Sequence, residues 1–271
     1  MNSREQSSPE DYWNSNLDPD NIGRASRGGP LDFERELPYY LIPDQIDALN
    51  DFAPLERKRI LDIGAGIGMN ALYLGNSGAI VVAADIARNR LAALAGIASG
   101  MSAPPLILPV QCRAEALPFA SGSFDHAYSK SVLIHTRLAE ACGETNRVLR
   151  EEGSAVFIEP LAGNPFANLY RALLAPKIWR SITRYFGQPE FDVIAGQFCA
   201  ARVHYYYFLG FLAFFWQFGL RAAWLFKWSL NLLVMADGLL FRICQPLERR
   251  AWFAVIHVRK RPSGESALPR S

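Results

Sequence analysis

Short apolar runs alternate with longer helix-like segments between residues 59 and 159 of this 271-residue chain. Five runs have the length and apolar content of buried strands, at residues 60–63, 79–84, 106–111, 124–129 and 154–158. Helical patterns lie between or after them at residues 69–77, 86–99 and 137–150. Strands that alternate with helices form parallel sheets, so this order predicts an α/β sheet with helices on both faces.

The chain beyond residue 160 has a different pattern. Residues 163–185 have a helical composition, and residues 201–207 have that of a strand. Residues 207–241 are almost continuously apolar or aromatic, and residues 252–258 form a last strand-like run. The pattern therefore predicts an apolar helical insertion, residues 208–247, before the last strand of the sheet.

This apolar stretch has a narrow polar face if it is helical. At ~100° per residue, six side chains share an arc of about 120°: Gln217, Arg221, Trp224, Lys227, Trp228 and Asn231. Three interpretations are open: a helix packed on the sheet with this face in water, an interfacial helix that touches a membrane, or a membrane span. Lys227 and Asp237 interrupt the apolar runs, which argues against a span.

Composition narrows the class of protein. Apolar residues make up 50% of the chain and charged residues 20%, which is typical of a globular domain. The net charge of +2 is too small to favour a nucleic-acid partner. The four cysteines form no CxxC pair, so we expect no metal site and a reducing, cytoplasmic location.

The two ends of the chain are polar. Residues 1–35 contain several glycines and prolines and lack a signal-peptide pattern, so they predict a flexible N-terminal segment or a lid. Residues 36–260 are expected to form one domain, and residues 261–271 a polar tail. Four aromatic residues in or near the N-terminal segment either close over a site or pack on the surface: Tyr12, Trp13, Tyr39 and Tyr40.

The strongest chemical signal runs from Ile60 to Gly68, an apolar strand followed by a Gly-rich turn and the start of a helix. Gly64 and Gly66 let the backbone turn tightly and approach a ligand, and the helix N-terminus offers free N–H groups. A dinucleotide-binding GxGxxG loop is the competing interpretation, but Gly68 comes one residue early for it. Asp62 would repel a pyrophosphate, so the motif favours a ligand with an ammonium or sulfonium group.

Asp85 follows the second strand-like run, 19 residues after Gly66. A carboxylate at this position accepts hydrogen bonds from ribose hydroxyls in nucleoside-binding α/β sheets. An ordinary contribution to the start of the next helix is the alternative, and the two roles are compatible.

Several motifs in this order resemble the class I S-adenosylmethionine-dependent methyltransferases, in the small-molecule branch that includes the ubiquinone/menaquinone-type enzymes. Residues 61–68 (LDIGAGIG) resemble that family's motif I, and Asp85 matches its ribose-binding acid. Residues 114–119 (AEALPF), 122–125 (GSFD) and 147–150 (RVLR) resemble its later segments. The resemblance implies a Rossmann-like, seven-stranded methyltransferase sheet with S-adenosyl-L-methionine as cofactor.

The resemblance also implies a role for each matching residue. The methionine part would lie on Asp62 and the loop of Gly64, Ala65, Gly66 and Gly68; the ribose on Asp85; the adenine against Ile86, Ala114 and Glu115; and the amino group near the backbone of Ser129. Arg113 departs from the family, which often has an aspartate there that accepts a hydrogen bond from adenine. Because arginine cannot accept one, either the backbone recognises adenine or cofactor binding is weakened.

His135 is the candidate catalytic base, because it follows the fourth strand-like run at the edge where open α/β sheets bind ligands. A packing or capping role in the next helix is the alternative. The implied activity is methyl transfer to a small, hydrophobic or lipid-like acceptor. A non-catalytic S-adenosylmethionine-binding module and a nicotinamide oxidoreductase are the competing functions. Peripheral membrane contact through residues 208–241 is one option for this cytoplasmic protein.

Overall fold

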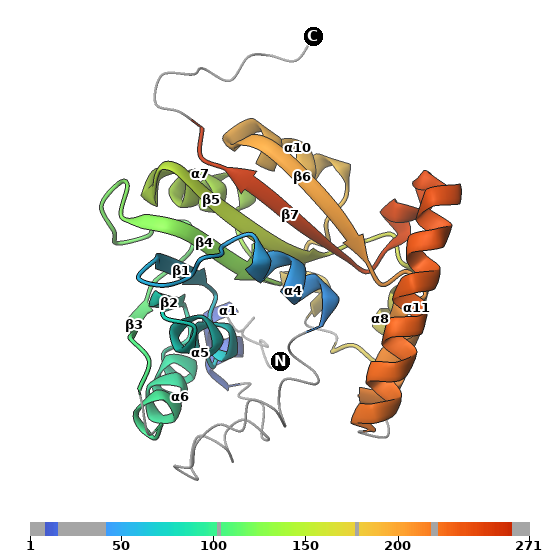
Figure 1. Ribbon diagram of the computed structural model, residues 1–271, viewed down its shortest axis with the longest axis horizontal. Coiled ribbons are helices and arrows are strands. Elements are labelled where there is room, and N and C mark those ends of the chain that lie inside the picture. Colours follow the sequence, from blue (N-terminus) through green and yellow to red (C-terminus); the bar gives the residue numbers. More distant parts are fainter. Residues whose placement is uncertain (1–8, 16–41, 102–103, 177–178, 218–221, 262–271) are drawn as a thin grey trace, which may run out of the picture.

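A computed structural model describes residues 9–15, 42–101, 104–176, 179–217 and 222–261. At its centre is one sheet in the order β3-β2-β1-β4-β5-β7-β6 (Figure 1). The strands are β1 (Arg59–Ile63), β2 (Ile80–Asp85), β3 (Ile107–Gln111), β4 (Phe124–Lys130), β5 (Leu149–Pro160), β6 (Cys199–Tyr206) and β7 (Phe253–Arg259). β1 to β5 are parallel, and β7 lies antiparallel between β5 and β6. The predicted seven-stranded Rossmann-like sheet is confirmed.

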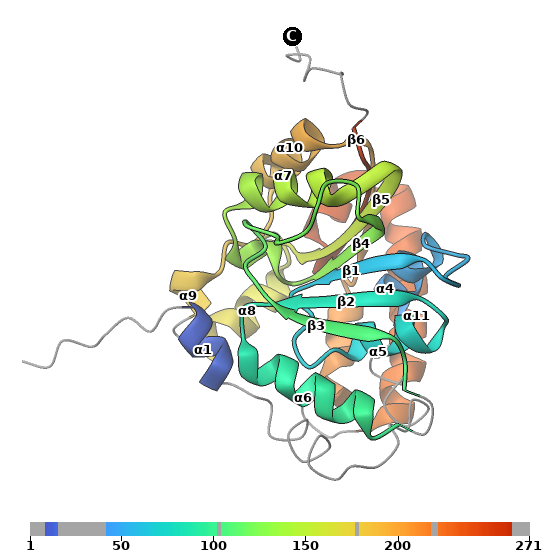
Figure 2. The same cartoon turned by 90° about the vertical axis from the view of Figure 1, so that its left-hand side faces the viewer.

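Helices cover both faces of the sheet (Figure 2). One face carries α4 (Pro43–Asn50), α5 (Met69–Asn76) and α6 (Arg88–Ser99), and the other carries α7 (Leu138–Val148) and α10 (Gln188–Gln197). Successive residues of β1 belong to the two different cores, Ile60 to the first and Leu61 to the second, and both are fully buried. A strand buried on both faces needs a continuous apolar run, which explains why the sequence marks these strands so clearly.

Helices α8 (Pro165–Leu173) and α11 (Ala223–Ile243) lie at the end of the molecule opposite β3 and α6 (Figure 1). The other C-terminal elements are α9 (Trp179–Ile182), η2 (Gly210–Ala213) and η4 (Gln245–Arg250). Asn164 caps α8, accepting from the Ala167 N–H at 2.8 Å, while its amide donates to the carbonyls of Tyr207, Phe208 and Arg250. A single buried side chain therefore joins three segments that are distant in sequence.

The apolar insertion before the last strand is confirmed. The polar arc predicted for it is only partly present on one helix, because Trp224, Lys227, Trp228 and Asn231 lie exposed on α11 while Gln217 precedes it. Residues 210–213 form a short 3₁₀ helix, and α11 begins only at Ala223. Gln217 lies before that helix, and Arg221 lies outside the described residues. The Asp237 carboxylate accepts from the N–H groups of Leu209 and Gly210, which ties α11 to the separate η2 turn.

Other departures lie where local patterns are weak. α10 was not expected at all. Within the predicted N-terminal segment, residues 9–15 form helix α1 (Pro9–Ser15), and the remainder lies outside the described residues, as does the predicted tail beyond residue 261. Helix α11 is long and apolar enough to cross a membrane by length and composition, with 22% of its most apolar window buried.

Candidate functional site

The Gly-rich turn between β1 and α5 has a backbone that other residues would strain. Gly64 has a φ of +69°, and a Cβ there would lie 2.2 Å from the side chain of Val132. Gly68 has a φ of +80°, and a Cβ there would lie 2.2 Å from Leu94 in α6. Gly68 therefore serves the packing of α5 on α6, and it does not line a cavity beside the loop.

Asp85 connects the turn to the next helix. Its Oδ2 accepts from the Gly66 N–H at 2.8 Å, and its Oδ1 accepts from the Ala87 N–H at 2.7 Å. The side chain is 7% exposed at the carboxyl end of β2. Each carboxylate oxygen keeps a further acceptor site, so Asp85 can hold the loop and still bind a hydroxyl.

A cavity of about 270 Å³, called here the first cavity, opens above the ends of β1, β2 and β4. It brings together six of the residues expected in the site: Gly64, Asp85, Ile86, Ala114, Glu115 and His135. Arg113 also lines it, and its Nε lies 3.7 Å from Glu115 Oε2. Because Glu115 Oε1 accepts from the Arg137 N–H at 3.0 Å, that carboxylate is largely engaged by the protein itself.

A second cavity of about 350 Å³ adjoins the first and includes the expected Ala65 and Gly66. The two cavities share Gly64, Arg90 and Lys130 as wall residues. The Lys130 Nζ lies 2.8 Å from Asp44 Oδ2, and the Tyr207 hydroxyl donates to Asp44 Oδ1 at 2.7 Å. The sequence analysis missed this trio, of which Asp44 and Tyr207 are fully buried and Lys130 is partly exposed. Its one local signal was the position of Lys130 directly after Ser129.

Two expected residues are buried below the cavities. Asp62 and Ser129 are 1% and 0% exposed. Within the described part of the chain, Asp62 Oδ2 and Ser129 Oγ have no hydrogen-bond partner. Burial raises the pKa of Asp62 to about 8, with the nearby Asp85 charge adding to it and a hydrogen bond from the Ala71 N–H opposing it. An ionised Asp62 would thus be stabilised by a cation in the site.

His135 lies in η1 (Leu133–His135), directly after β4. Its Nδ1 lies 2.8 Å from the Ile182 carbonyl oxygen, and a carbonyl can only accept, so Nδ1 carries the proton and Nε2 is the acceptor. Burial lowers the pKa of His135, and the bond to Ile182 opposes this only in part. The imidazole is therefore neutral at pH 7, with a lone pair available on Nε2.

Glu159 at the end of β5 holds the turn that carries His135. Its Oε1 accepts from the N–H groups of Val132 at 3.1 Å and Leu133 at 2.9 Å. Burial raises the pKa of Glu159 to about 8, and these backbone bonds act in the opposite direction. The sequence analysis did not single out this residue as part of the site.

His135 also lines a third cavity, of about 240 Å³, whose walls are mainly aromatic and apolar. This third cavity shares the wall residues Trp13, Ser131 and His135 with the first cavity, and Trp252 and Phe253 with the second. His135 therefore stands on the wall between the cavity of the expected cofactor residues and a separate aromatic one.

Helix α1 lies beside this junction. The Arg90 guanidinium lies 4.5 Å from the centre of the Trp13 ring, and its Nε donates to the Trp13 carbonyl at 3.2 Å. The Trp13 ring is 5.4 Å from that of His135. The Trp179 indole donates to the Tyr12 hydroxyl at 2.8 Å. A lid role for this segment stays a prediction, and Tyr39 and Tyr40 lie outside the described residues.

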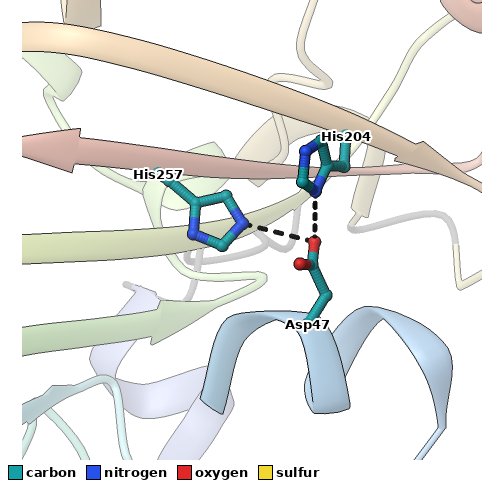
Figure 3. Close-up of side chains that lie close together, drawn as sticks. All are labelled: Asp47, His204 and His257. Carbon is teal, nitrogen blue, oxygen red and sulfur yellow. Dashed lines mark hydrogen bonds and ion pairs between the residues drawn. The ribbon is translucent and has the colours of Figure 1, made fainter. Parts of the chain in front are cut away.

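A further polar cluster ties α4 to the C-terminal strands (Figure 3). Asp47 Oδ2 lies 2.7 Å from His204 Nδ1 on β6 and 3.2 Å from His257 Nε2 on β7. Burial alone would raise the pKa of Asp47, but its hydrogen bonds to His257 and His204 outweigh it and lower the value to about 2. The cluster fixes the helix that also supplies Asp44 to the second cavity.

The Gly-rich turn and Asp85 lie in a part of the chain that matches a known family. A family described as a methyltransferase domain matches residues 61–157. The biotin biosynthesis bifunctional protein BioHC of Cellvibrio japonicus is 32% identical over 161 residues, 57% of this chain and 31% of that protein. The chain thus spans less than a third of that relative's length. The ubiquinone biosynthesis O-methyltransferase of Sodalis glossinidius is 28% identical over 193 residues, 67% of this chain and 75% of that protein.

Among solved structures, geranyl diphosphate C-methyltransferase of Streptomyces coelicolor A3(2), in complex with S-adenosyl-L-homocysteine, matches with a TM-score of 0.63. The match covers 96% of this chain and 99% of that chain at 14% identity, which establishes the fold. Residues 61–157 therefore match a methyltransferase domain, and the chain has the fold of class I S-adenosylmethionine-dependent methyltransferases. The resemblance drawn from the sequence motifs is confirmed.

Proposed function

We propose that this chain, with its methyltransferase domain, transfers a methyl group from S-adenosyl-L-methionine to a small apolar acceptor that gives up a proton. The observation that carries the proposal is the position of His135. Its ring lines both the cavity of the cofactor candidates and the aromatic cavity beside it, with Nε2 as a neutral acceptor.

The residues of the first and second cavities fit the proposed cofactor. Asp85 keeps acceptor sites for ribose hydroxyls, and Ile86 and Leu117 offer apolar walls for a purine. The unpartnered Oδ2 of buried Asp62 suits the positively charged ammonium group on the methionine part of the cofactor. When bound, the cofactor supplies a methyl group already activated on a sulfonium, so the protein mainly positions the acceptor and excludes water.

The third cavity supports an apolar acceptor. Its walls include Trp13, Trp179, Tyr185, Trp252 and Phe253, and a flat apolar molecule would pack well on such rings. His135 Nε2 would take the proton that a phenol or an acidic C–H loses as it is methylated, while Glu159 holds the turn in place.

The names of two relatives support the same class of acceptor. One curated relative acts in ubiquinone biosynthesis as an O-methyltransferase, and one structural neighbour is a geranyl diphosphate C-methyltransferase. We propose further that the protein is cytoplasmic and contacts a membrane surface through residues 208–241, where such an acceptor would dissolve.

The first experiment is calorimetric titration of S-adenosylmethionine into the wild-type protein. We expect saturable binding that Asp85→Ala weakens at least about tenfold, since the variant removes the proposed ribose acceptor. Asp192→Ala is the matched control, because the Asp192 carboxylate is exposed on α10 and accepts a hydrogen bond from Gln188 of the same helix. Asp85→Asn, which keeps one acceptor oxygen for the loop, guards against a simple folding defect.

Turnover is then measured by transfer of radiolabelled methyl to a panel of apolar phenols and prenyl compounds. Cofactor binding without turnover on any acceptor would favour the non-catalytic module. Binding of a nicotinamide dinucleotide in place of S-adenosylmethionine would replace the proposal with the oxidoreductase interpretation.

A further inference from the structure

The outer face of α11 is unusual for a helix at the surface of a globular protein. Six large apolar side chains along it are exposed by 53–75%: Trp224, Trp228, Leu232, Met235, Leu239 and Ile243. At ~100° per residue they fall within about 100° of the helix circumference, opposite the face that buries Phe226, Leu230 and Phe241. They form one continuous stripe along the helix.

A second exposed apolar surface lies on α8, the following Leu174 and the η2 turn, and η2 packs against both α8 and α11. Leu169, Leu173 and Leu174 are 60–73% exposed, and Leu212 and Phe215 are 45% and 62% exposed. An apolar groove of about 490 Å³ runs between these two elements. Figure 1 shows α8 and α11 at the same end of the molecule. We call the exposed apolar side chains of α8, η2 and α11, with Phe215, the docking face.

The groove leads toward the proposed active site. Tyr170 of α8 lines both the groove and the third cavity, the aromatic one that contains His135. Phe214 lines both the groove and the second cavity. An apolar molecule held in the groove would therefore be separated from His135 by a single shared wall.

The charges on the docking face have one sign. Among the described residues of α8, η2 and α11, the exposed ionic side chains are the cations Lys227 and Arg242. The acid of α11, Asp237, is 2% exposed and engaged by the N–H groups of Leu209 and Gly210. Exposed tryptophans next to cations suit the headgroup region of an anionic bilayer.

The same features argue against two other arrangements of this face, a membrane span by α11 and pairing with a second copy of the chain. Crossing a bilayer would pull α11 away from η2 and leave the Asp237 carboxylate without its backbone donors. Pairing with a second copy through this face would bring two sets of cations together, which costs energy in an interface between identical patches.

We propose that the docking face lies flat on the surface of an anionic lipid bilayer and that the groove beside it admits the apolar acceptor from the membrane. Entry of the acceptor through the groove rests on the proposed function, whereas contact of the docking face with the bilayer does not. Helix α11 would lie in the plane of the interface, with its stripe among the acyl chains and Asp237 still in the protein.

The experiment is co-sedimentation of the full chain with phosphatidylcholine vesicles, with and without phosphatidylglycerol, at two salt concentrations. We expect binding that increases with the anionic lipid and decreases with salt. Leu173→Ser/Leu174→Ser and Trp228→Ser/Met235→Ser should each lower the vesicle partition coefficient by about tenfold or more. Lys227→Glu/Arg242→Glu should remove the preference for phosphatidylglycerol.

Leu106→Ser/Leu108→Ser is the matched control, because these side chains at the β3 edge are also about half exposed, at 55% and 50%. It should bind vesicles as the wild type does. Failure of the wild type to bind, or equal loss in the control, would overturn the proposal. So would a dimer in light scattering that the α8 and α11 variants dissociate, since the face would then be a contact between copies.

Calorimetry with S-adenosylmethionine on the same proteins separates this proposal from the proposed function. Vesicle binding with no cofactor binding would leave the docking face standing and remove the enzyme. Cofactor binding with no vesicle binding would remove the docking face and leave the proposed enzyme standing.

Discussion

The two halves of the sheet edge line the proposed site in different ways. On the β1–β2–β3 side, the site consists of backbone turns and short polar contacts, with Gly64, Gly66 and Asp85 all within one β–α–β stretch. On the β5–β7–β6 side, it consists of aromatic side chains that include Trp179 of α9, Tyr185, Trp252 and Phe253 of β7, and Trp13 of α1 completes the cavity from beside α6. The first half is shaped by local backbone geometry, and the second by contacts between residues far apart in sequence. Predictions that separate the two halves follow, from the largest expected effect to the smallest.

His135→Gln tests the junction between the halves and should have the largest effect. Without the acceptor nitrogen, kcat should fall by about 10²–10⁴ on an acceptor that must lose a proton, with little change in cofactor affinity. His126→Gln is the control, because that ring bonds Ser154 inside the sheet. Since burial holds the pKa of His135 below its ordinary value of 6.5, the loss of kcat that protonation of His135 causes should be confined to more acidic solution, and His135→Gln should lack that acid limb. An unchanged kcat would assign His135 to packing.

Gly64→Ala tests the backbone half. The new Cβ would meet Val132 at 2.2 Å at a φ of +69°, so we expect a loss of about 2–4 kcal/mol in the free energy of unfolding. Gly66→Ala should cost about 1 kcal/mol, because its nearest neighbour is the end of Arg90 at 3.5 Å. Gly96→Ala in α6 is the control and should stabilise slightly. Urea unfolding measures all three, and equal losses at Gly64 and Gly66 would contradict the steric argument.

Asp237→Ala tests the side-chain half. Removing the carboxylate leaves the N–H groups of Leu209 and Gly210 without their buried acceptor, at a cost of about 1–3 kcal/mol. Hydrogen exchange should speed up in α11 and η2 and stay unchanged in β1 and β2. Faster exchange across the whole sheet would mean that the two halves are a single cooperative unit.

The acid limb of the stability curve should show the smallest effect. The pKa of Asp47 is lowered to about 2 in the folded protein from an ordinary 3.8, so its contribution is complete above pH 4 and is lost as pH falls toward 2. Asp47→Asn should flatten that limb of the unfolding free energy against pH. Because the pair with His204 is partly exposed, added salt should weaken the difference.

The same contrast explains what the sequence could predict. The strands of the first half are continuous apolar runs, and the turn after Ile63 needs glycines that are adjacent in the chain, so both are visible locally. The trio of Asp44, Lys130 and Tyr207 spans 163 residues and has no local signature. The polar arc predicted within residues 207–241 was incomplete for a related reason: a helical wheel assumes one helix, whereas the structure has a separate 3₁₀ turn at Gly210–Ala213 and begins α11 only at Ala223.

The position of β7 has a consequence for how the protein is made. β6 reaches the rest of the sheet only through β7, which lies between it and β5. During synthesis, residues 199–206 therefore leave the ribosome without a partner strand and must wait for residues 253–259. β1 to β5 pair with one another earlier, so the cofactor half can fold on the nascent chain. The apolar residues of η2 and α11 emerge in that interval, after those of α8, and this is when the chain most needs protection from aggregation.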